Sequence, residues 1–154
     1  MATNSLPTRD ILNQRFETFN SSCALCGNEL ESICHLFFTC PIARAVWFES
    51  CWGFRTDSQI VQSSDDIIKL ILAPPPTTTT LDVESWYVSS AMTFVVDRIW
   101  NSRNKAIFQG KKFNICEACL QIQGRSTEFC TIIQAANQAH RSCTFILGLE
   151  TAPD

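Results

Sequence analysis

Four residues with metal-binding side chains follow one another closely near the N-terminus, namely Cys23, Cys26, His35 and Cys40. Their spacing, C-x2-C-x8-H-x4-C, restricts the possible folds of this chain more than any other feature. Two cysteines separated by two residues and followed by Gly27 are typical of a tight turn that presents both thiolates to one metal ion. Zinc takes four sulfur or nitrogen ligands in a tetrahedron, so the pattern predicts a zinc site filled by four protein ligands. Such a site is structural, because no position remains for a reacting water molecule.

The cysteine content leaves two alternatives open. The chain has 154 residues and nine cysteines. An odd number without a secretory signal argues against a disulfide framework, so metal binding and unpaired core thiols remain. Cys34 is adjacent to His35 and could replace it as a ligand. Because neighbouring side chains usually diverge, we take His35 as the ligand and Cys34 as a core thiol. A second pair, Cys116 and Cys119, has no further pair at ligand spacing and is not expected to bind a metal.

The hydrophobic pattern of the N-terminal half predicts short helices. Residues 6–22 fit a short helix and its exit turn. Pro41 suits the first position of a helix, where its missing N–H costs nothing, and Gly53 suits the residue after the last turn. The apolar run at 66–72 is short and fits either a helix or a strand.

Two long helices are predicted in the C-terminal half, after a Pro/Thr-rich linker at 74–80. Apolar residues recur near every 3.6 positions over 82–108, and Gly110 is the expected terminator. A second helical segment covers about 115–145 and is expected to be broken or weakened at Gly124.

These elements predict a mainly α chain, a small helical domain with an N-terminal CCHC zinc knuckle and two long C-terminal helices. The expected parts are a zinc-binding module at 6–53, a connecting segment at 54–81 and a helical extension at 82–147.

Composition excludes several classes of function. The net charge is −3, so the chain as a whole lacks the strongly basic character of many nucleic-acid binders. No apolar stretch is long enough to span a membrane and no secretory signal is present, which predicts an intracellular protein, nuclear or cytoplasmic, without a membrane partner. No nucleophile elbow or phosphate-cradling glycine loop occurs, so we expect no catalysis. A cysteine nucleophile with His35 as its base is the enzymatic alternative, and it requires a metal-free His35.

One local cluster combines cations with aromatic side chains, and residues 98–113 contain no acidic residue. This composition is typical of a surface that contacts phosphates and stacks on bases. The alternative is a helix whose aromatic residues face the core while its charges face water. The candidate nucleic-acid contacts are Arg98, Trp100, Arg103, Lys105, Lys111 and Lys112.

Several motifs together resemble a known family. They are Leu6-Pro7-Thr8-Arg9-Asp10-x-Leu12, Cys23-x-x-Cys26-Gly27, His35-Leu36-Phe37-Phe38-x-Cys40-Pro41-x-Ala43-Arg44-x-x-Trp47 and Ile99-Trp100-Asn101-x-Arg103-Asn104-x-x-Ile107-Phe108. In order and spacing they look like the zinc-binding domain of plant non-LTR retroelement reverse transcriptases. In that family the module lies between the polymerase and a ribonuclease H domain. The resemblance implies one zinc ion held by Cys23, Cys26, His35 and Cys40.

The chain departs from that family in what accompanies the module. It contains no Y-x-D-D polymerase motif, and no ribonuclease H-like segment follows Phe113. We therefore expect a fragment or a standalone derivative that has no catalysis of its own. The expected role is to assist nucleic-acid engagement or domain orientation, with RNA, DNA, or the polymerase or ribonuclease H domains of a parent element as partners. The alternative is a domesticated protein–protein interaction module that does not bind nucleic acid.

Overall fold

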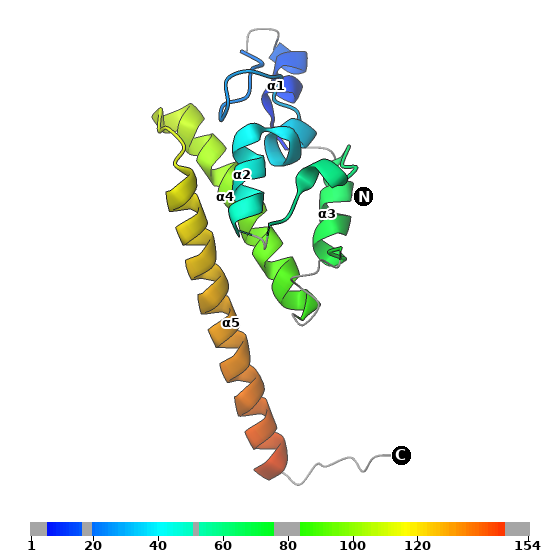
Figure 1. Ribbon diagram of the computed structural model, residues 1–154, viewed down its shortest axis with the longest axis vertical. Coiled ribbons are helices and arrows are strands. Elements are labelled where there is room, and N and C mark those ends of the chain that lie inside the picture. Colours follow the sequence, from blue (N-terminus) through cyan, green and yellow to red (C-terminus); the bar gives the residue numbers. More distant parts are fainter. Residues whose placement is uncertain (1–5, 17–19, 51–52, 76–83, 147–154) are drawn as a thin grey trace.

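The computed structural model describes residues 6–16, 20–50, 53–75 and 84–146. Side chains are described as far as residue 138. Figure 1 shows an assembly of helices. Within these residues the only β pairing is an isolated antiparallel bridge between Ser22 and Leu30. The predicted mainly α fold is thus confirmed, including the two long C-terminal helices. In chain order the helices are α1 (Arg9–Phe16), the π-helix η1 (His35–Thr39), α2 (Pro41–Ser50), the 3₁₀-helix η2 (Thr56–Ser58), α3 (Ser64–Leu72), α4 (Ser85–Gln109) and α5 (Ile115–Ile146).

Helix α4 lies at the centre of the arrangement. It runs antiparallel to α5, α2 packs against both, and α3 packs against α4 on the side away from α5 (Figure 1). One hydrophobic core extends from the cysteine-rich segment to α5 and includes Trp47, Val95, Ile99 and Ile122. The Trp47 indole N–H donates to the Phe37 carbonyl at 2.7 Å, so the largest buried side chain is also satisfied as a polar group.

The helix ends follow the expected signals. Pro41 begins α2, and the Gly53 amide donates to the Phe48 carbonyl at 3.0 Å. Gly53 has φ 72° and Gly110, after α4, has φ 63°. Glycine is favoured at both positions because a side chain is disfavoured in the left-handed region.

The structure resolves one open point of the sequence analysis, at α3, and corrects another, at Gly124. The ambiguous segment at 66–72 is helical in α3, where Ser63 and Asp66 form a reciprocal capping box. Helix α5 passes through Gly124 without interruption, so the expected break there is wrong. Packing explains the continuity, because Ile122 and Ser126 on either side of the glycine are both buried. The Thr-rich part of the linker, at 77–80, lies outside the described residues.

Helix α5 extends well past the other helices, and its C-terminal part projects from the body of the molecule (Figure 1). Among the described residues, no helix combines the length and apolar character needed to cross a membrane.

Candidate metal centre and basic surface

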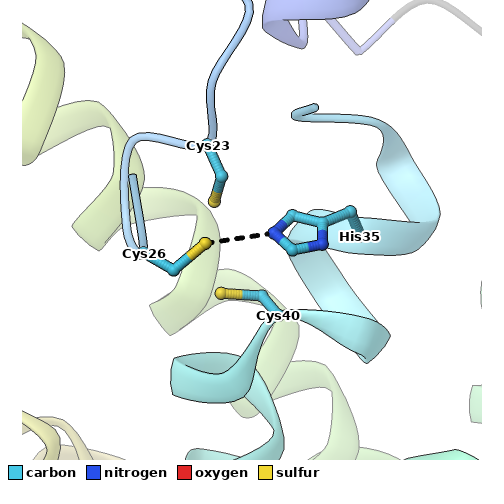
Figure 2. Close-up of side chains that lie close together, drawn as sticks. All are labelled: Cys23, Cys26, His35 and Cys40. Atoms are coloured by element: carbon cyan, nitrogen blue, oxygen red, sulfur yellow. Dashed lines mark hydrogen bonds between the residues drawn. The ribbon is translucent and has the colours of Figure 1, made fainter. Parts of the chain in front are cut away.

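The four predicted ligands meet at one point. One ligand atom from each of Cys23, Cys26, His35 and Cys40 lies within 4.8 Å of the other three (Figure 2). Cys23, His35 and Cys40 are buried, and Cys26 is partly exposed. No other group of three or more His, Cys, Asp or Glu side chains in the described part of the chain could hold a metal ion.

A tight turn supplies the first two ligands. The Gly27 amide donates to the Cys23 carbonyl at 2.8 Å, and Gly27 has φ 75°. The strand-like bridge between Ser22 and Leu30 closes this turn, helped by the Cys23 amide, which donates to the Glu29 carbonyl at 2.7 Å. The turn therefore holds both sulfur atoms on the side that faces η1.

A π turn supplies the other two ligands. The Cys40 amide donates to the His35 carbonyl at 2.8 Å, five residues back. An α-helix has 3.6 residues per turn, so residues five apart do not share a face, whereas a π turn brings them to the same side. His35 and Cys40, which are separated by four residues, can therefore bind one metal ion together only because this segment is a π-helix.

Glu29 orients the histidine and was not foreseen from the sequence. Its carboxylate lies 3.1 Å from Nδ1 of His35, and the Thr39 hydroxyl lies 3.3 Å from the same atom. The other ring nitrogen, Nε2, lies 3.3 Å from the Cys26 sulfur and faces the cluster. Metal-binding histidines commonly donate their second N–H to a carboxylate, which fixes the tautomer with a free nitrogen toward the metal. The only signal in the sequence was an acidic residue between the ligands.

The cysteine thiols differ in acidity. A hydrogen bond from the Cys23 thiol lowers the pKa of Cys40, and the backbone amides of Ala43 and Ile42 at the start of α2 lower it further. The same contact with Cys40, followed by burial, raises the pKa of Cys23. Of the two thiols in this buried pair, Cys40 therefore loses its proton more readily than Cys23.

The donor set fits zinc. Three sulfur atoms and one imidazole nitrogen form a Cys3His set, a composition that recurs in structural zinc sites. Cys34 is not part of the cluster, and burial raises its pKa. It is only partly buried and lies outside the hydrophobic core, so the expectation of a core thiol is wrong. The structure therefore selects His35 over its neighbour.

A buried ion pair connects the knuckle to α4. Glu31 is fully buried, and its carboxylate accepts hydrogen bonds from the amides of Arg9 and Ala24 at 3.0 and 2.9 Å. The Arg103 guanidinium donates to the same carboxylate at 2.7 and 3.0 Å and to the Pro7 carbonyl at 3.0 Å. Since Ala24 lies between the first two metal ligands, one carboxylate joins the metal turn, α1 and α4.

This pair corrects the predicted nucleic-acid surface. Arg103 is only 2% exposed, so its charge is used inside the protein and it is not available to a phosphate. Trp100 is half-buried, stacks on Phe37 with ring centroids 6.4 Å apart, and lies beneath the Arg103 guanidinium. The core-facing alternative therefore describes Trp100, whereas Arg103 fits neither expectation, because its charge is buried in an ion pair with Glu31.

The other four predicted contacts share one surface hollow. Arg98, Lys105, Lys111 and Lys112 line a cavity of about 130 Å³ at the turn between α4 and α5. Lys105, Lys111 and Lys112 are exposed, and Arg98 is half-buried. The cation cluster therefore divides between a buried ion pair and a basic pocket.

The fold and the cluster define a helical module with a Cys3His group that could hold a metal ion. Residues 1–47 match the family described as zinc-binding in reverse transcriptase. The N-terminal part of the chain is thus similar to the zinc-binding modules of reverse transcriptases, in agreement with the resemblance seen in the sequence. The segment around Trp100, which also resembles that family, lies outside the matched residues. No curated protein and no solved structure matches the chain significantly.

Proposed function

We propose that this chain is a non-catalytic module of reverse-transcriptase origin, which binds one structural zinc ion and assists nucleic-acid engagement. The observation that carries the proposal is the four-ligand cluster, whose donor atoms lie within 4.8 Å of one another inside the family-matched segment.

A structural role for zinc follows from the ligand number. Four protein ligands fill a tetrahedron, so zinc at this site would act as a cross-link between the Cys23–Cys26 turn and η1. Metal-dependent order of this segment is expected, because metal binding to a site of this kind is coupled to folding. A second effect is expected at α4. Because the Glu31–Arg103 ion pair joins this segment to α4, zinc binding would also help to fix the position of that helix.

Zinc stoichiometry on matched variants tests the metal assignment. We expect one zinc per purified wild-type chain by elemental analysis, strong loss in His35→Ala, and full retention in Cys34→Ala. If His35→Ala retained its zinc and Cys34→Ala lost it, the ligand would be Cys34 and the assignment of His35 would be wrong. Wild-type protein without zinc, purified under reducing conditions, would refute the proposed metal role.

A salt titration tests the nucleic-acid role. Affinity for single-stranded RNA or DNA is expected to fall with rising salt, because cations that neutralise phosphates release condensed counterions. Absence of salt-dependent binding to both polymers would refute nucleic-acid engagement by this chain.

A protein-interaction module is the second candidate, and the projecting helix supports it. Leu120 and Ile132 on α5 are 69% and 58% exposed, and the net charge of −3 disfavours contact with a polyanion. An affinity capture that recovers a specific protein and no RNA would favour this candidate over the first.

A further inference from the structure

The basic pocket at the α4–α5 turn gathers like charges around a hollow. Four cations line it, namely Arg98 and Lys105 from α4 and Lys111 and Lys112 from the connecting turn. The one carboxylate in the lining, on Glu117, accepts a hydrogen bond from Gln121 at 2.9 Å. The pocket is therefore positively charged, and its volume of about 130 Å³ is roughly ten times what one water molecule needs.

The pocket cations differ from most other cations of the described residues. None of the four lies within 4.0 Å of a carboxylate of that part of the chain. Cations that do have such a partner are Arg44, Arg55, Lys69, Arg103 and Arg125. Gathering cations without internal partners costs electrostatic repulsion, which an external anion would offset.

Helix geometry reinforces the positive potential. Arg98, Ser102 and Lys105 are spaced i, i+4 and i+7 on α4, so they share one face of that helix. The pocket also contains Asn114, whose side chain caps the start of α5 by accepting from the Glu117 amide at 3.1 Å. The positive end of a 32-residue helix thus points into the same region.

An exposed aromatic ring lies next to these cations in the chain. Phe108 is three residues after Lys105, one helical turn along the same side of α4, and is 78% exposed. A free phosphate ion gains nothing from an exposed aromatic ring, because it has no group that stacks on one. A nucleotide has a base that can stack on the ring.

We propose that the α4–α5 pocket binds backbone phosphates of single-stranded nucleic acid, with a neighbouring base stacked on Phe108. The inference rests on the proposed function and assigns its main contact to the helical extension, outside the zinc module. Arg98 and the three lysines neutralise phosphate charge, and Phe108 favours an unpaired base over a duplex.

Fluorescence anisotropy with a labelled single-stranded RNA tests the assignment on the zinc-loaded full chain. The pocket variant is Lys111→Gln with Lys112→Gln, and the control is Arg44→Gln with Arg55→Gln, which removes the same charge from another exposed surface. Each phosphate contact to a single strand contributes about 0.7 to the salt slope, so the pocket variant should bind roughly 25-fold more weakly at 0.1 M salt. Its salt slope should fall by about 1.4, and the control should retain wild-type binding.

The remaining arms separate the possible failures. Phe108→Ala should weaken binding of the single strand and leave duplex binding unchanged. Equal loss in the pocket and control variants would refute the pocket assignment while nucleic-acid engagement stands. Wild-type protein that binds neither RNA nor DNA would refute the proposed function and this inference together. Displacement of the RNA by millimolar inorganic phosphate at constant ionic strength would identify a free-phosphate site and overturn the inference. Circular dichroism and zinc content check that every variant is folded.

Discussion

Replacing Arg103 by methionine should destabilise the protein strongly, because it leaves the Glu31 carboxylate buried without its cation. The two side chains are 3% and 0% exposed, and their closest atoms are 2.7 Å apart. Ion pairs at exposed sites contribute at most about 1 kcal/mol, but removing one partner of a buried pair costs about 3–5 kcal/mol. Because the Glu31–Arg103 pair is buried, the cost for a buried pair applies. Arg103→Met should therefore lower the free energy of unfolding by about 3–5 kcal/mol at neutral pH.

The chain offers a matched control for this substitution. Arg125 also pairs with a carboxylate, that of Asp97, and its guanidinium lies over the ring of Phe94, as Arg103 lies over Trp100. The Arg125–Asp97 pair is 47% and 41% exposed, so the main difference between the two sites is burial. Arg125→Met should therefore cost no more than about 1 kcal/mol.

Urea unfolding at saturating zinc measures both effects. With a slope of about 1–3 kcal/mol/M, a loss of 3 kcal/mol or more moves the midpoint by at least about 1 M. Circular dichroism and tryptophan fluorescence should give coincident transitions, which would justify two-state treatment. The double variant Glu31→Gln with Arg103→Met should cost clearly less than the two single changes added together, because the isolated charge is then gone. Equal costs for Arg103→Met and Arg125→Met would refute the reasoning from burial.

Two further predictions concern the metal site and α3. Glu29→Gln should lower zinc affinity about 10–100-fold, because His35 loses the carboxylate that orients it; competition with a chelator measures this, with Glu128→Gln as the exposed control. A hydrogen bond from the Ser63 side chain and the backbone amides of Gln62 and Ser63 lower the pKa of Asp66. Its contribution to stability should thus be present above the ordinary carboxyl pKa of about 3.9 and be lost as the pH falls through the lowered value. Titration of the carboxyl by NMR should show a higher pKa in Ser63→Ala, and an unchanged pKa would contradict the capping box.

Local signals were enough to predict the metal ligands and most helix ends. Cysteine spacing, the proline that opens α2 and the glycine after α4 each act through neighbouring residues, so a single sequence contains the information. The capping box of α3 was equally local, and the Ser63-x-x-Asp66 spacing would have resolved that segment as a helix. Gly124 misled the prediction because its cost of about 1 kcal/mol is smaller than the gain from packing α5 on both sides of it.

Long-range pairing was beyond local reasoning. Arg103 and Glu31 are 72 positions apart, and a cation next to an aromatic residue reads as a surface contact when its partner is unknown. Glu29 and Glu31 presented a similar difficulty, because both lie between the metal ligands. Only the folded turn shows that Glu29 faces the histidine ring while Glu31 faces α4.

The buried Glu31–Arg103 pair also links the zinc knuckle to the orientation of the basic pocket on α4. On α4, Ile99 and Arg103 are four residues apart and face the core and the knuckle, whereas Arg98 and Lys105 face the basic pocket. The two sets alternate along one rigid helix, so fixing one set fixes the rotation of the helix and hence the direction of the other. Arg103 holds that rotation through a carboxylate that also binds the backbone of the metal turn. Under the proposed function, the zinc module would therefore act on nucleic-acid binding through the orientation of the pocket cations.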